Sequence, residues 1–207
     1  MAYLRSEEQS MFRDKKIVII AGQQNLLHYG LSLLVEDICS KRNMTVAYAQ
    51  DEDGLCITPG NTLGEYKLAI LCLSCDVYFS RWFRLLLNAL EITNGNLLIF
   101  KDAKEILNHK RKSILSRVCS LESILNSSMP LSYISNTIES YLDRNESFLR
   151  FSRVTSREIS VLEGYLAGID AACHSSRLGI DIKTLYQHRK NCANKLGVRN
   201  LKDLLRL

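Results

Sequence analysis

The sequence lacks any apolar run long enough to cross a membrane. A spanning helix needs about 18 or more consecutive apolar residues, and the longest candidate, residues 68–79, is interrupted by Ser74 and Asp76. The N-terminal segment is polar and contains no apolar stretch of the kind that forms the centre of a secretory signal peptide. We therefore expect a cytoplasmic protein with neither a membrane-spanning segment nor a signal peptide.

Motifs that carry common enzyme chemistry are also missing. The sequence has no glycine-rich phosphate loop, no H-E-x-x-H or G-x-S-x-G, and no recognisable pair of catalytic carboxylates. It therefore predicts neither an enzyme nor a cofactor.

The seven cysteines do not form a disulfide framework, because their number is odd and their spacing is irregular. Cys72 and Cys75 form a single C-x-x-C, but no second pair and no nearby histidine complete a zinc site. We expect two small residues at the end of a buried strand and no bound metal. A redox switch between these two thiols remains the alternative.

Negative charge is scarce in the last third of the chain. Residues 149–207 contain 11 Lys and Arg against 5 Asp and Glu, whereas residues 1–148 contain 16 against 17. The net charge of +5 therefore resides in the C-terminal part. This distribution favours an anionic partner, with nucleic acid first, although many solvated helical faces are also basic.

Short buried strands alternate with helices as far as residue 143. Strands are expected at residues 16–21, 44–49, 68–73, 96–100 and, weakly, 123–125, and helices at 27–38, 82–90, 103–118 and 131–142. Such alternation favours right-handed crossovers and a parallel sheet, so residues 15–143 are predicted to form an α/β flavodoxin-like domain. Residues 1–14 are expected to be a loose arm, and residues 144–153 a linker.

From residue 154 onward the sequence predicts helices only. Thr155-x-x-Glu158 is a capping box, and Asp170, Asp181 and Asn200 are suited to cap three further helices. Glycine follows the first three of these helices, at positions 168, 179 and 197. Residues 154–207 are therefore predicted to form an all-α domain of four helices that contains a helix-turn-helix.

This segment resembles the helix-turn-helix of LuxR/FixJ-type regulators. The resemblance rests on V-T-x-R-E from Val154, on Ala167-Gly168 and on K-L-G-V from Lys195, and it covers the whole unit without a gap. It implies that the helix at 182–196 enters the major groove of double-stranded DNA. The DNA-binding positions that it indicates are Tyr186, Gln187 and Lys190 for bases, and Lys183, Thr184 and His188 for backbone or structure, with Lys195 as a further cation.

The same helix has an apolar side, and one neighbouring position departs from the family pattern. We expect Ile182, Leu185, Cys192 and Leu196 to pack inward while the polar residues face outward. In the preceding helix, His174 stands where the family has a buried aliphatic residue. Burying a neutral histidine costs free energy unless it is hydrogen-bonded, so a weakened core and a simply packed histidine both remain open.

The resemblance also implies that the fourth helix joins two DNA-binding domains. Leu201, Leu204 and Leu205 form its apolar face, which either a second subunit or the domain's own core has to cover. We expect a homodimer, or a heterodimer with another LuxR-type regulator.

The N-terminal domain resembles a response-regulator receiver whose phosphorylation chemistry is missing. The resemblance rests on residues 17–25 and on Tyr29-Gly30-Leu31. In that register, the acidic pair that binds Mg²⁺, the phosphoacceptor, the switch hydroxyl and the lysine of a receiver fall on Gly22 and Gln23, Cys72, Lys101 and Ser127. Because Mg²⁺ prefers carboxylate oxygens, we expect a receiver-like fold without aspartyl phosphorylation.

A degenerate receiver joined to a LuxR-type domain resembles a group of enterobacterial auxiliary and fimbrial regulators that includes RcsA, BglJ, EcpR (MatA) and FimW. The resemblance implies a phosphorylation-independent transcriptional regulator that controls surface structures such as fimbriae or capsule. The alternative is an auxiliary interaction protein that modulates a partner response regulator by heterodimerisation and barely binds DNA itself.

Overall fold

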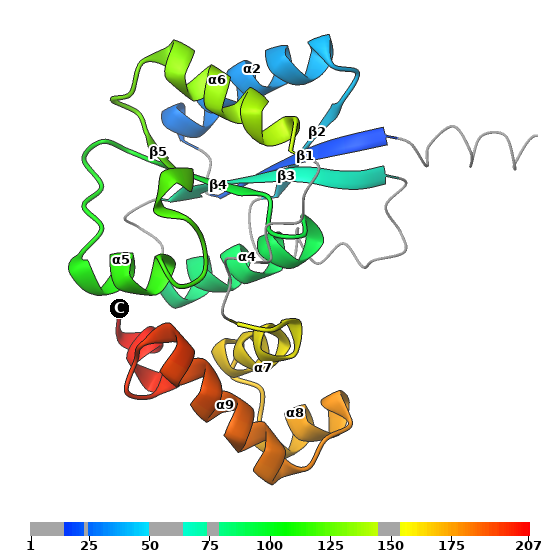
Figure 1. Ribbon diagram of the computed structural model, residues 1–207, viewed down its shortest axis with the longest axis vertical. Coiled ribbons are helices and arrows are strands. Elements are labelled where there is room, and N and C mark those ends of the chain that lie inside the picture. The colour runs from blue at the N-terminus through cyan, green and yellow to red at the C-terminus, as the bar shows by residue number, and fades with distance from the viewer. Residues whose placement is uncertain (1–14, 23–24, 50–63, 74–78, 145–153) are drawn as a thin grey trace, which may run out of the picture.

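The computed structural model describes residues 15–22, 25–49, 64–73, 79–144 and 154–207, which form two successive domains (Figure 1). The first domain contains β1 (Lys15–Ala21), α2 (Leu26–Lys41), β2 (Thr45–Ala49), β3 (Gly64–Leu73), α4 (Phe79–Ile92), β4 (Leu97–Lys101), α5 (His109–Leu115), η1 (Leu121–Ser123), β5 (Ile124–Asn126) and α6 (Leu131–Leu142). The second contains α7 (Ser156–Leu166), α8 (Ala171–Leu178), α9 (Ile182–Leu196) and the 3₁₀ helix η3 (Leu201–Arg206).

The five strands form one parallel sheet in the order β2-β1-β3-β4-β5. Helices α2 and α6 cover one face of the sheet, and α4 and α5 cover the other (Figure 1). This is the predicted flavodoxin-like arrangement, and every predicted strand is present within a few residues of its expected place.

Strand β1 shows why both faces of the sheet are apolar. Val18 and Ile20 point into the cluster under α2 and α6, whereas Ile19 and Ala21 point into the cluster under α4. All four are buried. A parallel sheet covered on both faces requires such a continuous apolar run rather than an alternating one.

Helix α5 is shorter than the predicted helix at 103–118. It begins at His109, because the Asn108 side chain accepts a hydrogen bond from the backbone N–H of Arg111 at 2.8 Å. Before it, the Lys101 ammonium donates to the carbonyl of Glu105 at 2.7 Å, which stabilises a turn. Asparagine caps helices because its short side chain competes for backbone donors.

The second domain begins with the predicted capping box. Thr155 accepts a hydrogen bond from the backbone N–H of Glu158, and the Glu158 carboxylate accepts one from the backbone N–H of Thr155. The predicted fourth helix is instead the 3₁₀ helix η3, which opens on a capping box between Asn200 and Asp203.

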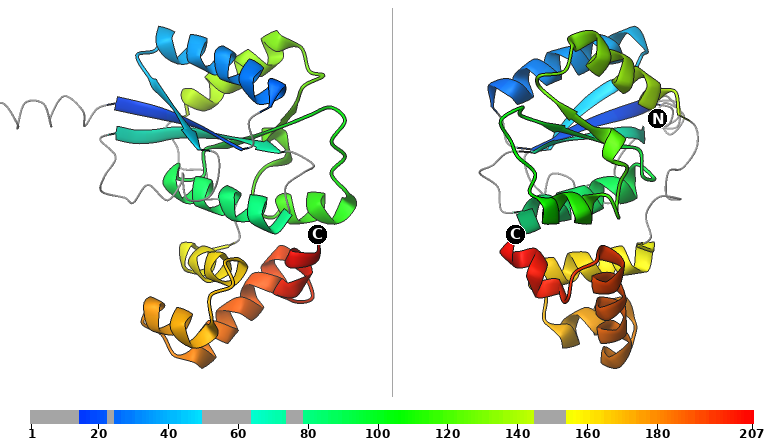
Figure 2. Two further views of the ribbon diagram at one scale, coloured as in Figure 1. Left: turned by 180° about the vertical axis from the view of Figure 1, so that it is seen from behind. Right: turned by 60° about the vertical axis from the view of Figure 1, so that its left-hand side comes forward.

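The two domains are docked through α4 and α5. Helix α4 packs against α7 and η3 (Figure 2), and one hydrophobic cluster extends from Phe83 and Leu86 of α4 to Val154, Leu162 and Leu204 of the second domain. The sequence did not predict this continuity, because helical periodicity identifies a buried face but not the element that covers it.

Several predictions fall outside the described residues, namely the loose arm at 1–14, nearly all of the linker at 144–153, and the positions of Gln23 and Cys75. Across the described helices, none is both long enough and apolar enough to cross a membrane.

Candidate nucleic-acid interface

Helices α8 and α9 form the helix-turn-helix. Asp170 begins α8 by accepting a hydrogen bond from the backbone N–H of Ala172 at 2.8 Å. Gly179 ends it with a φ of +61°, in the left-handed region that favours glycine. Asp181 precedes α9 as predicted, but its side chain makes no capping hydrogen bond there.

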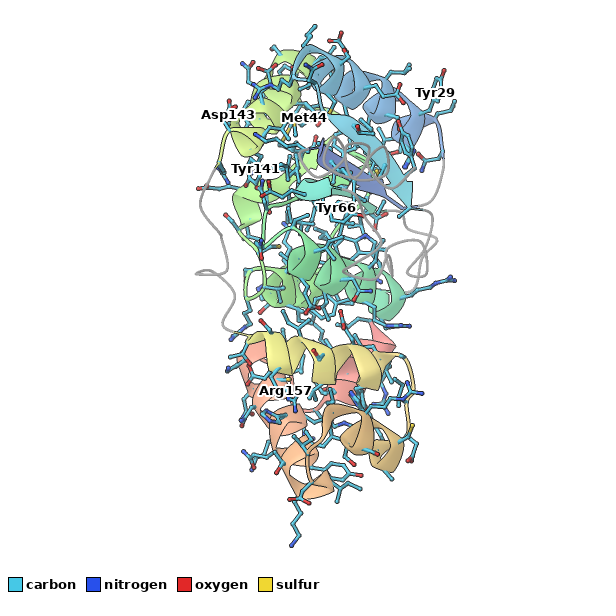
Figure 3. All side chains as sticks on the ribbon, turned by 90° about the vertical axis from the view of Figure 1, so that its right-hand side faces the viewer. Tyr29, Met44, Tyr66, Tyr141, Asp143 and Arg157 are labelled. Atoms are coloured by element: carbon cyan, nitrogen blue, oxygen red, sulfur yellow. The ribbon has the colours of Figure 1, made fainter. Side chains whose placement is uncertain are left out.

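Helix α7 holds this pair of helices in place. The Arg157 guanidinium donates to the carbonyl of Leu178, at the end of α8, at 2.5 Å. Figure 3 labels Arg157 on α7, on the side that faces α8 and α9. Helix α9 packs against both α7 and α8. The C-terminal carbonyls of α8 and the body of α9 are therefore positioned by the first helix of the domain.

The inward face of α9 matches the prediction at three of four positions. Leu185, Cys192 and Leu196 are fully buried, and Ala193 joins them at 3% exposure. Ile182 was predicted to pack inward but is 43% exposed. It is the first residue of the helix, and the covered stretch begins only with Leu185.

The outward face of α9 carries most of the predicted DNA-binding residues. Five of them are exposed within the first nine residues of the helix: Lys183, Thr184, Tyr186, Gln187 and Lys190. His188 is half-buried. The exposed group combines two cations with hydroxyl and amide groups, which are the groups that contact phosphates and base edges in a DNA groove.

Arg189 supports this surface and was not among the predicted site residues. Its guanidinium carbon lies 5.5 Å from the centre of the Tyr186 ring and 4.9 Å from that of Tyr165 on α7. Cation–π contacts at these distances restrain the ring. Arg189 therefore connects the exposed Tyr186 to the domain framework.

Gln187 is also restrained in the unbound protein. Its amide nitrogen donates to the side-chain oxygen of Asn191, one turn later, at 3.0 Å. The contact holds the Gln187 amide along the helix surface, and a bidentate contact to a base requires that this hydrogen bond be rearranged.

Lys195 has a structural role that differs from the predicted DNA contact. Its ammonium lies 2.6 Å from the carboxylate of Glu158 on α7, which is only 5% exposed. Burial alone would raise the pKa of Glu158, but hydrogen bonds from Lys195 and Thr155 lower it below its ordinary value. Lys195 thus neutralises a buried carboxylate, a partner 37 residues away that helical spacing does not reveal.

His174 is a packed histidine. It is 3% exposed and faces Gly164 of α7. Burial lowers its pKa, and the nearby cation Arg189 acts in the same direction, while a hydrogen bond with the backbone of Ser160 opposes them. Its Nδ1 has no hydrogen-bond partner among the described groups. The neutral ring therefore fills the position that the family gives to an aliphatic side chain.

The predicted dimer surface is largely internal. Leu201 is 4% exposed and Leu204 is fully buried, both in the cluster shared with α4. Only Leu205, at 48% exposure, remains on the surface. Of the two alternatives for covering this face, the structure shows the domain core and the docked first domain over Leu201 and Leu204, which leaves Leu205 as the leucine available to a second subunit.

The described positions that the receiver resemblance assigns to a phosphorylation site are Gly22, Cys72, Lys101 and Ser127, and they lie at the carboxyl edge of the sheet. Gly22 lies against Cys72, since a Cβ on Gly22 would fall 2.8 Å from the Cys72 carbonyl oxygen. The Ser127 backbone N–H donates to the carbonyl of Lys101 at 3.1 Å. Burial raises the pKa of the Cys72 thiol to about 12, so this thiol stays protonated and is a poor partner for metal or oxidant.

The family comparison identifies the second domain. Residues 152–207 match the model of the family described as bacterial regulatory proteins, luxR family. The four-helix domain built on α7, α8, α9 and η3 is therefore a LuxR-type helix-turn-helix domain. No curated protein sequence matches the chain.

Solved structures similar to this chain cover nearly its full length. RcsB from Salmonella enterica serovar Typhimurium, bound to promoter rprA in the presence of phosphomimetic BeF₃⁻, is 20% identical with a TM-score of 0.41 over 94% of this chain and 100% of that one. The response regulator StyR is 19% identical with a TM-score of 0.41 over 93% and 97%. Full-length FixJ from B. japonicum is 16% identical with a TM-score of 0.40 over 93% and 95%.

Proposed function

We propose that this chain is a cytoplasmic bacterial transcriptional regulator that binds specific DNA sequences without aspartyl phosphorylation. The observation that carries the proposal is the exposed polar face of α9, on a segment that matches the luxR family model. Lys183, Gln187 and Lys190 supply the cations and the amide that groove recognition requires, and the excess positive charge of residues 149–207 suits a polyanion.

The residues at the carboxyl edge of the sheet in the first domain support phosphorylation independence. Gly22 and Cys72 bring no carboxylate to the positions where a receiver binds Mg²⁺ and accepts phosphate. We infer that this domain serves as a scaffold rather than as a phosphate switch. The combination resembles regulators of fimbriae and capsule, and we propose surface structures as the regulated class.

Selection from random-sequence duplexes by the purified full chain tests the DNA-binding proposal. We expect one enriched sequence that binds about 10³-fold or more tightly than random duplex at the same salt concentration. Equal affinity for all duplexes would contradict it. Sequence preference that emerges only with a second LuxR-type regulator present would replace it with the auxiliary, heterodimeric function.

Treatment with acetyl phosphate and Mg²⁺ tests the second part of the proposal. We expect DNA affinity to stay the same and no phosphoprotein to accumulate. A stable, base-labile phosphoprotein would overturn phosphorylation independence while leaving the DNA-binding result intact.

A further inference from the structure

An open cavity of about 380 Å³ lies where the two domains meet. One wall comes from α5, including His109, Lys110 and Ile114, and the other from the residues after α9, including Val198 and Arg199. Figure 1 shows α5 directly beside the end of the second domain, and both views of Figure 2 agree. Its volume falls in the range of small-molecule sites, roughly 300–1,000 Å³.

The polar lining of this cavity is strongly basic. His109, Lys110, Arg199 and Arg206 all contribute to it. Within the described part of the chain, none of these four side chains forms an ion pair or a side-chain hydrogen bond. Lys110, Arg199 and Arg206 are exposed cations, and three cations on one cavity provide a binding potential for an anion.

Two acceptor groups at the cavity have hydrogen-bond partners of their own. The Asp203 carboxylate accepts a hydrogen bond from the backbone N–H of Asn200 and belongs to the capping box of η3. The backbone oxygen of Leu207 accepts a hydrogen bond from Nε of Arg111 at 3.1 Å. The Asp203 carboxylate keeps its negative charge, so the lining combines this one carboxylate with Lys110, Arg199 and Arg206 and carries a net positive charge.

Contacts between the domains hold the two walls together. Nη1 of Arg117 donates to the carbonyl of Lys195 at 3.2 Å, and its guanidinium lies over Gly197, where a Cβ would come within 2.7 Å of it. The backbone φ of +68° at position 197 also favours glycine. The cavity thus depends on docking, since each domain supplies only part of its lining.

The cavity lies at the far end of α9 from the base-reading surface. Lys183 and Gly197 are 14 residues apart on one helix, which corresponds to about 21 Å at 1.5 Å per residue. A ligand in the cavity would therefore leave the first half of α9 exposed to DNA.

We propose that this interdomain cavity binds a small anion that carries two or more phosphate groups. Guanidinium and ammonium groups bind phosphate oxygens through charge-assisted hydrogen bonds, and arginine does so in a bidentate manner. Ile114 and Val198 add an apolar wall for an organic portion. The ligand contacts both domains and so stabilises their docked arrangement, because a ligand shifts an equilibrium toward the state that binds it.

Calorimetric titration of the full chain with inorganic pyrophosphate, against a sodium chloride control at equal ionic strength, tests this proposal. The double variant Lys110→Ala/Arg199→Ala removes one cation from each wall. The control Lys112→Ala/Lys202→Ala removes two exposed cations, one from α5 and one from η3, and neither of these residues lines the cavity. We expect the cavity variant to bind pyrophosphate at least tenfold more weakly, and the control to bind within twofold of wild type.

Saturating pyrophosphate should also raise the thermal midpoint of wild type and control but not that of the cavity variant. No pyrophosphate binding by wild type, or an equal loss in both double variants, would overturn the proposal.

DNA is the other source of phosphate, and a DNA titration at several salt concentrations separates the two. We expect both double variants to show the same salt slope. A slope that falls by about two units in the cavity variant alone would show that the cavity binds the DNA backbone, and would also overturn the proposal.

Discussion

Gly164 and His174 form a complementary pair across the contact of α7 with α8. The imidazole of His174 lies directly over Gly164, so that a Cβ at position 164 would fall 2.2 Å from Cε1 of the ring and 2.4 Å from Nε2. Real Cβ atoms do not approach so closely, so the buried ring requires glycine here. The histidine departs from the family pattern, and the missing side chain of its neighbour makes room for it.

Gly164→Ala should destabilise the protein by roughly 1–3 kcal/mol, because overpacking displaces a buried ring. The sign of this stability change tests the contact, since replacing glycine by alanine inside an unobstructed helix stabilises a protein by roughly 0.5–1 kcal/mol. Gly30→Ala in α2 is the matched control, because nothing lies within 4 Å of its added Cβ. Urea unfolding measures both. Stabilisation by Gly164→Ala would show that His174 leaves this position readily.

Glu163 makes the junction between α7 and α4 sensitive to pH. Burial raises its pKa to about 7, and the nearby Glu91 carboxylate adds to the shift while Arg84 opposes it. The folded state therefore holds the proton more tightly than the unfolded state does. The contribution of Glu163 to the free energy of unfolding is therefore most favourable below pH 4.5, and it is lost as pH rises through 7.

Glu163→Gln should consequently stabilise the protein at pH 8 by roughly 1–3 kcal/mol, since each pKa unit corresponds to about 1.4 kcal/mol. At pH 5 the same variant should differ little from wild type. Glu122→Gln changes an exposed carboxylate and serves as the control. An effect of Glu163→Gln that does not depend on pH would contradict the assignment.

Lys195→Ala should affect folding more than base recognition. It leaves the buried Glu158 carboxylate without its cation, which we expect to cost about 1–3 kcal/mol, given that the Lys195 side chain is itself 33% exposed. Glu158→Gln in the same chain should recover part of the loss, because glutamine preserves the capping box. Lys190→Ala, on the exposed face, should change stability by less than about 0.5 kcal/mol. Equal stability of the two lysine variants would show that the ion pair with Glu158 does not stabilise the fold, and would favour the predicted DNA contact for Lys195.

The sequence predicted what depends on local pattern. Three of the four apolar positions of α9 are buried as its periodicity indicated, and the caps at Thr155 and Asp170 are in place. The sequence did not predict contacts between distant segments. The partner of Lys195 lies on another helix, and the sequence left open what covers Leu204, because nothing in its own segment shows that α4 packs there.

Substitutions at Leu204 and Leu205 should have different effects, because Leu204 is buried and Leu205 is exposed. Leu204→Asp places a charge in the fully buried core and should unfold the domain, with equal loss of binding to one and to two half-sites. Leu205→Asp changes a side chain that is 48% exposed and should leave the circular dichroism spectrum intact. If η3 contributes to a dimer, Leu205→Asp should weaken binding to a two-half-site operator more than to one half-site. Equal binding by wild type and Leu205→Asp would place the dimer contact elsewhere.

The outward residues of α9 should separate into two kinds. Lys183 lies at the start of the helix, where phosphate contacts gather. Lys183→Ala should weaken all duplexes alike and reduce the salt slope by about one unit. Gln187 and Lys190 lie further along the exposed face, where glutamine suits adenine and lysine suits guanine, and each alanine variant should lose roughly 1–3 kcal/mol of discrimination. Tyr186 can act by stacking on a thymine methyl or through its hydroxyl on phosphate.

The measurement is affinity for the selected operator and for random duplex at several salt concentrations, with folding followed by circular dichroism. Lys202→Ala is the control, because Lys202 is an exposed cation in the same domain but outside α9. Gln187→Ala must also release Asn191 from its 3.0 Å hydrogen bond, so Asn191→Ala separates that local effect from base recognition. If Gln187→Ala and Lys190→Ala both keep the wild-type ratio of operator to random affinity, α9 does not read the sequence and the proposed function loses its basis.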